Sequence, residues 1–138
     1  MNKIMNQPEM YQEDLSRGFI QAYQDLLSFP NGDLHQVVRK NLPTNPETAV
    51  IGVCDGGHMP AFAGYVGEGM LHGAAVGDTF KAPKAEDIFA VITQTDMGKG
   101  CVLIPLIWNQ ELDEEVAKAV HMAEFSGIPV SVAVIRDD

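Results

Sequence analysis

Hydrophobic and polar positions along this chain follow two kinds of pattern, and each predicts one kind of element. Hydrophobic residues recur every three or four positions over residues 11–26, 85–92 and 112–123, as on the buried face of an amphipathic helix. Short, mainly hydrophobic runs at residues 36–39, 49–54, 102–107 and 130–135 predict strands. Stretches rich in Gly, Pro and Asn mark turns and loops between them.

From residue 49 onward the expected elements alternate between strand and helix. Such an order is typical of a parallel sheet whose crossover helices lie on its faces. The sequence therefore predicts an α/β fold, a three-layer sandwich with a mostly parallel central sheet and helices on both faces. With 138 residues, 46% of them hydrophobic, the chain is long enough for one compact domain over residues 1–138 and too short for two.

The acidic balance of the chain narrows its possible partners. It carries 9 Lys and Arg against 19 Asp and Glu, a formal net charge of −10, whereas binding to nucleic acid phosphates requires the opposite sign. The longest apolar stretch, Cys101–Trp108, is far shorter than the roughly 20 residues of a membrane-spanning helix. The segment Met1–Glu9 is polar, unlike the start of a secretory signal. We therefore expect a cytoplasmic protein that binds neither nucleic acid nor a membrane.

The cysteines and most of the histidines have structural interpretations. Cys54 and Cys101 fall in apolar, strand-like surroundings, which favours reduced core thiols over a disulfide or a zinc site. The histidines are not paired at metal-ligand spacing, so no metal site is expected. His35 follows a turn, His121 falls near the end of a helix, and His72 lies in glycine-rich sequence, so a functional role is open but not favoured for each.

The glycine distribution marks the middle of the chain as the place for a site. Ten of the 13 glycines lie between Gly52 and Gly100, which implies tight turns and close backbone approaches there. Ligands of parallel α/β sheets bind beyond the carboxyl ends of the strands. Residues 55–58 follow one expected strand and residues 108–111 follow another, so we expect both loops to line one crevice.

The first of these loops reads Asp55-Gly56-Gly57-His58-Met59-Pro60. Pro60 suits the first position of a helix, whose free N–H groups would face an anionic or strongly polar ligand. The glycines lack the spacing of a dinucleotide-binding loop and no Walker lysine follows, so no nucleotide site is expected. His58 is the best candidate general acid or base, because imidazole titrates near neutral pH. The alternative is a tight turn capped by His58.

The second loop, Trp108-Asn109-Gln110-Glu111, places an aromatic ring, two amides and a carboxylate at a strand end. This combination could hold a small polyhydroxylated molecule. The alternative is structural: Asn109 is the N-cap of the following helix, and the negative charge of Glu111 interacts favourably with the positive end of the helix dipole.

Residues 53–60, Val-Cys-Asp-Gly-Gly-His-Met-Pro, resemble the segment Gly-Gly-Gly-Ser-Gly-His-Glu-Pro that follows a strand in the substrate-binding subunit of dihydroxyacetone kinase. The similarity continues through residues 61–71, 77–80 and 98–104 and covers nearly the whole chain. The resemblance implies the fold of the first domain of that subunit. It also implies that His58 is the histidine that hydrogen-bonds substrate and assists its phosphorylation, with Gly56 and Gly57 in the substrate loop.

Departures from the family pattern change what the resemblance implies. Asp55 stands where the family has the third glycine of its triplet, Leu106 where it has a lysine, and Glu111 where it has a functional aspartate. The family's covalent substrate histidine lies in a second domain that this sequence does not include. An added carboxylate and a missing lysine prepare the crevice poorly for a transferred phosphoryl group. We therefore expect no autonomous kinase activity and no cofactor bound by this chain; ATP or a phosphocarrier protein would come with another subunit.

Three functions remain open. The chain could be an accessory or regulatory module that binds a small ketose or polyol or docks on a dihydroxyacetone kinase partner subunit. It could instead be the substrate-binding component of a split kinase for dihydroxyacetone or a related ketose, with His58 and Glu111 catalytic. The third function is an oligomerisation domain with a vestigial crevice. A homo-oligomer is expected in any case, because a missing second domain leaves surface uncovered. The residues expected to bind the ligand are Asp55, Gly56, Gly57, His58, Trp108, Asn109 and Glu111.

Overall fold

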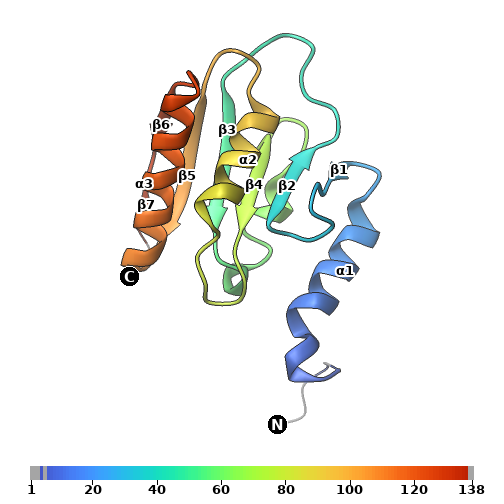
Figure 1. The fold of residues 1–138 in the computed structure, drawn as a ribbon. Helices are drawn as coiled ribbons and strands as arrows, with labels where there is room; N and C mark the ends of the chain where they lie inside the picture. Colours follow the sequence, from blue (N-terminus) through green and yellow to red (C-terminus); the bar gives the residue numbers. More distant parts are fainter. Residues whose placement is uncertain (1–3, 5, 137–138) are drawn as a thin grey trace.

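The computed structural model describes residue 4 and residues 6–136. Its α-helices are α1 (Tyr11–Tyr23), α2 (Ala85–Thr95) and α3 (Gln110–Phe125), and its 3-10 helices are η1 (Pro8–Met10), η2 (Gly56–His58) and η3 (Ala63–Tyr65). The strands are β1 (Leu27–Ser28), β2 (Gln36–Arg39), β3 (Ala49–Cys54), β4 (Gly73–Val76), β5 (Cys101–Ile107), β6 (Val130–Val132) and β7 (Ile135–Arg136). Figure 1 shows their arrangement.

The seven-stranded sheet has the order β1-β2-β4-β3-β5-β6, and β7 also pairs with β5. Strands β4, β3, β5 and β6 run parallel, while β2 and β1 extend one edge in antiparallel pairing. The prediction of an α/β fold with a mostly parallel sheet is therefore confirmed. Because β3 lies between β4 and β5, its carboxyl end lies in the middle of the sheet, beside the carboxyl ends of both neighbours (Figure 1).

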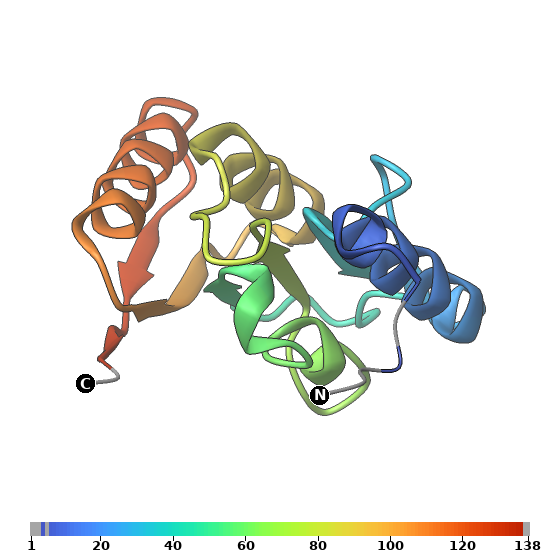
Figure 2. The same ribbon diagram turned by 90° about the horizontal axis from the view of Figure 1, so that it is seen from below.

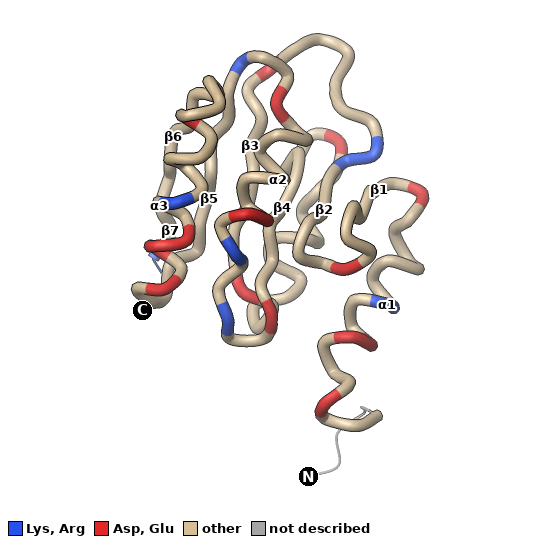
Figure 3. Tube along the Cα trace, in the orientation of Figure 1, with Lys and Arg blue, Asp and Glu red and all other residues tan. Residues whose placement is uncertain are grey.

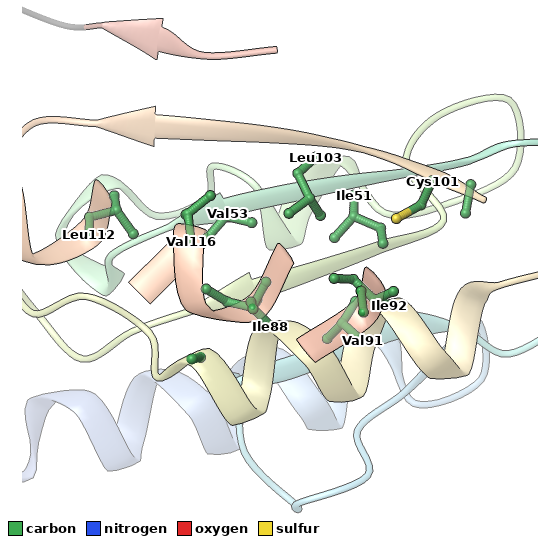
Figure 4. Close-up of a cluster of buried hydrophobic side chains, with 14 of the residues drawn as sticks. Ile51, Val53, Ile88, Val91, Ile92, Cys101, Leu103, Leu112 and Val116 are labelled. Atoms are coloured by element: carbon green, nitrogen blue, oxygen red, sulfur yellow. The ribbon is translucent and has the colours of Figure 1, made fainter. Parts of the chain in front are cut away.

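Helices α2 and α3 cover one face of the sheet (Figure 2). Ile88 of α2 and Leu112 of α3 are fully buried against residues such as Ile51 of β3 and Leu103 of β5 (Figure 4). Burying one side chain of this size contributes about 1.5–3 kcal/mol, so this layer accounts for much of the stability of the fold. It also fixes the relative positions of the central strands whose ends carry the candidate site.

The opposite face is covered by the segment that joins β3 to β4, with its 3-10 turns (Figure 2). Cys54, Ala63 and Val76 form part of this second core and are fully buried, and Phe19 and Ile20 of α1 pack against it. The second covering layer therefore combines short 3-10 turns with α1, so helical segments pack against both faces of the sheet.

No long helix begins at Pro60, contrary to the sequence prediction. Met59 has an extended conformation (φ −51°, ψ 137°), and turns lead from Pro60 to the three-residue η3. Gly64, Gly67 and Gly69 follow within this segment, and glycine is a poor helix former because it has the most backbone freedom to lose. The helix N-terminus expected to face a ligand is therefore not formed in this segment.

Strand β4 was not predicted from the hydrophobic pattern, because its sequence Gly-Ala-Ala-Val has mostly small side chains. The structure explains their size: a Cβ atom added at Gly73 would lie 2.7 Å from Cγ1 of Val91 on α2. Small residues therefore allow α2 to approach the sheet closely. The run at residues 130–135 was predicted as one strand but is divided between β6 and β7.

Acidic side chains are spread over the helices and loops, with fewer Lys and Arg among them (Figure 3). This distribution is unlike the concentrated basic surface that nucleic acid binding requires. In the part of the chain that the structure describes, no helix is both long enough and apolar enough to cross a membrane.

Candidate ligand-binding site

The loop after β3 joins His58 to Asp55. Asp55 is the N-cap of η2 and is fully buried; its Oδ1 accepts a hydrogen bond from the N–H of Gly57, and its Oδ2 lies 3.0 Å from Nδ1 of His58. The His58 side chain is 32% exposed, so the ring is held by a buried carboxylate yet still reaches the surface. An imidazole in this position can exchange a proton or a hydrogen bond with a ligand hydroxyl.

A second loop, which follows β4, packs against the first. The N–H of Gly56 donates a hydrogen bond to the carbonyl of Asp78 at 3.0 Å. Phe80 adopts a left-handed conformation (φ +58°) and is 69% exposed. A Cβ added at Gly57 would lie 2.9 Å from Cε1 of Phe80, and one added at Gly56 would lie 2.7 Å from the carbonyl oxygen of Gly77. Gly56 meets backbone of the second loop, so a side chain there would push the loops apart, whereas a side chain at Gly57 would displace the Phe80 ring.

His35 supports the loop after β4 by bridging two carboxylates. Its Nδ1 lies 3.0 Å from Oδ2 of Asp33, and its Nε2 lies 3.1 Å from Oδ1 of Asp78. Burial opposes the charged ring, but hydrogen bonds to Asp78 and Asp33 and their negative charges outweigh burial and raise the pKa of His35 above its ordinary value. This histidine therefore has a supporting role close to the candidate site.

The residues after β5 leave the sheet at the same edge as the β3 loop, because Val53 and Pro105 are directly opposite in the parallel ladder. Trp108 is 37% exposed. Asn109 caps α3 by accepting a hydrogen bond from the N–H of the third residue after it, which confirms the capping interpretation. Glu111 is exposed in the first turn of α3.

The structure connects only part of the predicted site. Asp55 and His58 are joined within one loop, and backbone hydrogen bonds link that loop to the loop after β4. Among the described residues, no hydrogen bond or ion pair joins Glu111 to His58. Ligand contacts of the two loops, including those of Trp108 and Asn109, remain predictions.

Phe80 and Asp78 are neighbours of the site that sequence reasoning did not single out. Both follow β4, and because this strand was not predicted, the sequence did not indicate that a third strand ends beside the loop after β3. In the sequence, Gly77 directly after a run of small residues could have indicated a turn at a strand end. The structure shows why glycine is needed there, because an added Cβ would lie 2.0 Å from the carbonyl oxygen of Lys81.

The other reactive side chains lie away from this loop cluster or are buried. Cys54 and Cys101 are free and buried, and burial raises their thiol pKa to about 12 and about 11, respectively. His72 is buried at the amino end of β4, and His121 is exposed on α3. Within the described residues, no group of three or more His, Cys, Asp or Glu side chains could hold a metal ion.

A cavity of about 680 Å³ lies between α1 and the segment before β2. Ser16 and Ile20 of α1 line one side, and Asp33 and His35 line the other. His58 does not belong to its lining. The cavity therefore adjoins the loop after β4 through His35, while His58 lies outside its lining.

Comparison with known proteins identifies relatives along almost the whole chain. Residues 17–138 match the family model described as the Dak1 domain. The dihydroxyacetone-binding subunit DhaK of a PTS-dependent dihydroxyacetone kinase from Lactococcus lactis is 33% identical over 138 residues, covering 99% of this chain and 40% of that subunit. The DhaKLM operon coactivator DhaQ from the same organism is 34% identical over 137 residues, covering 99% of this chain and 40% of DhaQ.

The same relationship holds in three dimensions. The crystal structure of the dihydroxyacetone kinase from C. freundii matches with a TM-score of 0.81 and 27% identity, covering 99% of this chain and 26% of that chain. The chain thus spans two-fifths or less of the length of these relatives. Because the family model matches most of the chain and the expected fold is present, the chain belongs to the Dak1 domain family.

Proposed function

We propose that this Dak1 domain binds a small ketose or polyol at the carboxyl end of β3 and acts as an accessory or regulatory module of a dihydroxyacetone kinase system. The observation that carries the proposal is the half-buried His58, held by the buried carboxylate of Asp55 on a glycine-rich loop at the central strand end. Phe80 and Trp108 offer exposed aromatic surface on the neighbouring loops. Aromatic rings and a few fixed polar groups are typical of small-molecule sites.

The charges around this loop favour binding over phosphoryl transfer. A transferred phosphoryl group needs positive side chains or metal ions around its oxygens. Here the buried carboxylate of Asp55 contacts His58 in the β3 loop, and Leu106, near the end of β5, packs with the apolar second core. A neutral polyol does not face this repulsion. That one relative, DhaQ, is an operon coactivator supports a regulatory role.

Isothermal titration calorimetry with dihydroxyacetone tests the proposal. The His58→Ala variant should bind more weakly by about 1.5–3 kcal/mol if the histidine pairs with a charged group, and by about 0.5–1.5 kcal/mol if it meets a neutral hydroxyl. His121→Ala is the matched control, because His121 is exposed on α3. Binding that is equal in all three proteins, or no binding of dihydroxyacetone, glycerol or a four-carbon ketose, would contradict the proposal.

The proposal also predicts that the chain alone does not phosphorylate dihydroxyacetone from ATP. A coupled assay of the purified protein should give the same rate as a blank without protein. Turnover that co-purifies with the protein and is lost in His58→Ala would show that the site is a complete kinase.

A second function is supported by a different feature, the outer edge of the sheet. Val132 of β6, Val134 between the strands and Ile135 of β7 are 41%, 44% and 44% exposed, which is much apolar surface for one edge. A further domain or a separate subunit could cover this edge, as expected for the substrate-binding component of a split kinase. Reconstitution with purified subunits that carry the rest of the kinase tests this function. Dihydroxyacetone phosphorylation that requires this chain would favour it over the accessory role.

The same edge supports self-association, in which two copies cover each other's apolar strip. Sedimentation velocity at micromolar concentration should show a dimer or larger species, and Val134→Lys should shift it toward the monomer. The wild-type protein sedimenting as a monomer would contradict this part of the proposal.

A further inference from the structure

We infer that Asp55 is the positioning residue of the site: it fixes the orientation and tautomer of His58, so that Nε2 of the ring accepts a hydrogen bond from the ligand. This inference deepens the proposed function, because it assigns the roles of two residues within the same site. It also revises our expectation that Asp55 itself contacts the ligand.

The contacts of Asp55 leave little capacity for a ligand. The side chain is fully buried, its Oδ1 accepts the N–H of Gly57, and its Oδ2 lies 3.0 Å from Nδ1 of His58. Both carboxylate oxygens are therefore engaged within the loop. A residue with no exposed surface acts on a ligand only through the group that it holds, which here is His58.

The Asp55–His58 contact determines which ring nitrogen carries the proton. A carboxylate only accepts hydrogen bonds, so Nδ1 of a neutral ring must donate to it. The proton of the neutral ring then lies on Nδ1, and Nε2 keeps its lone pair. Because the His58 side chain is partly exposed, this lone pair is available to a ligand O–H, which it can orient or from which it can take the proton.

Glu111, the other candidate catalytic residue, does not contact the ring. It is exposed in the first turn of α3, and among the described residues no hydrogen bond joins it to His58. The carboxylate that serves the histidine therefore comes from three residues earlier in the same loop. The orientation of His58 then depends on the β3 loop alone and not on the approach of α3.

The Asp55→Asn variant isolates this role while preserving the shape of the side chain. The N–H of Gly57 can only donate, so the amide oxygen of the substituted side chain would face Gly57 and its NH₂ group would face Nδ1 of His58. Nδ1 would then have to accept a hydrogen bond, and the proton of the neutral ring would move to Nε2. The same exchange in a serine protease triad leaves the geometry intact but produces the wrong tautomer.

Long-range ¹H–¹⁵N spectra of the histidine rings at alkaline pH measure the tautomer without any ligand. Wild-type His58 should show a protonated Nδ1 and an unprotonated Nε2, and Asp55→Asn should show the reverse. The matched control is Asp96→Asn, because Oδ1 of Asp96 also accepts a hydrogen bond, at 3.0 Å, from the glycine N–H two residues later, but the contact involves no histidine. The control should leave the His58 signals unchanged.

Two results would overturn the inference: a wild-type His58 ring that carries its proton on Nε2, or an Asp55→Asn ring unchanged from wild type in a folded protein. The wild-type spectrum decides alone if Asp55→Asn fails to fold. Calorimetry with dihydroxyacetone adds an independent readout, in which Asp55→Asn should weaken binding by about 3–10-fold, the equivalent of one neutral hydrogen bond. If wild type binds no ketose while the tautomer is as inferred, the proposed function fails and the positioning role stands.

Discussion

Replacing His72 tests whether this histidine stabilises the fold and has no role in ligand binding. His72 is 4% exposed, and its Nδ1 accepts a hydrogen bond from the backbone N–H of Val50 at 3.0 Å. Its Nε2 lies 2.9 Å from Oε1 of Glu47. The imidazole thus satisfies a backbone donor of β3, while its own backbone N–H donates to the carbonyl of Val50 at 2.8 Å. His72→Ala removes the imidazole that accepts the N–H of Val50 but keeps the backbone hydrogen bond to the carbonyl of Val50.

The expected cost follows from these contacts. An unpaired backbone N–H away from water costs about 1–3 kcal/mol. Glu47 is 54% exposed, so its hydrogen bond should contribute no more than about 0.5 kcal/mol. His72→Ala should therefore lower the free energy of unfolding by about 1.5–3 kcal/mol. In a domain of this size, the melting temperature should fall by about 5–12 °C.

Urea denaturation of wild type, His72→Ala and Glu47→Gln measures these differences, and an unchanged m-value shows that the comparison is valid. Ligand binding should not change in His72→Ala, because His72 precedes β4 and the site lies at the carboxyl ends of the strands. The reasoning is refuted if His72→Ala unfolds within about 0.5 kcal/mol of wild type, or if Glu47→Gln costs as much as His72→Ala.

Other predictions test the packing, the charges and the thiols. Gly73→Val should cost about 1–3 kcal/mol in urea denaturation, because the added carbon atoms overlap Val91. The raised pKa of His35 means that its charged contacts stabilise the fold fully below its ordinary pKa and lose this effect as the pH rises through the raised value. The stability lost in His35→Gln, about 0.5–1 kcal/mol at pH 6, should therefore shrink by pH 8.5, and a constant loss would contradict the assignment. Burial raises the pKa of Cys54 to about 12 and of Cys101 to about 11, so neither thiol should react rapidly with Ellman's reagent at pH 8 before unfolding.

The fold could be predicted wherever large side chains mark the elements. The expected strands 36–39 and 49–54 coincide with β2 and β3, because Val and Ile side chains pack on the sheet faces there. Strand β4 has mostly small side chains, and only the position of α2 in the folded protein explains them. A close approach between elements far apart in sequence leaves no local periodicity, so this strand could not be read from the pattern.

The candidate site was predictable in its location and less so in its internal contacts. A glycine-rich loop after a buried strand located His58 at the central strand end, because the carboxyl ends of parallel strands share one edge of the sheet. The pairing of His58 with Asp55 was missed. It depends on the turn of η2, in which residues three apart face each other. We expected a helix to begin at Pro60 and did not predict the 3-10 turn before it, so the sequence did not indicate the pairing.

The most direct test of the central claim is a ¹H–¹⁵N HSQC titration of the labelled protein with dihydroxyacetone. A ligand held by His58 should shift the backbone amides of residues 55–58 and of the loop after β4, together with those after β5 if the crevice closes around it. Amides that line the cavity beside α1, such as those of Ser16 and Ile20, should stay in place. Shifts confined to that cavity, or a spectrum unchanged at saturating ketose and polyol, would contradict the claim that the end of β3 is a binding site.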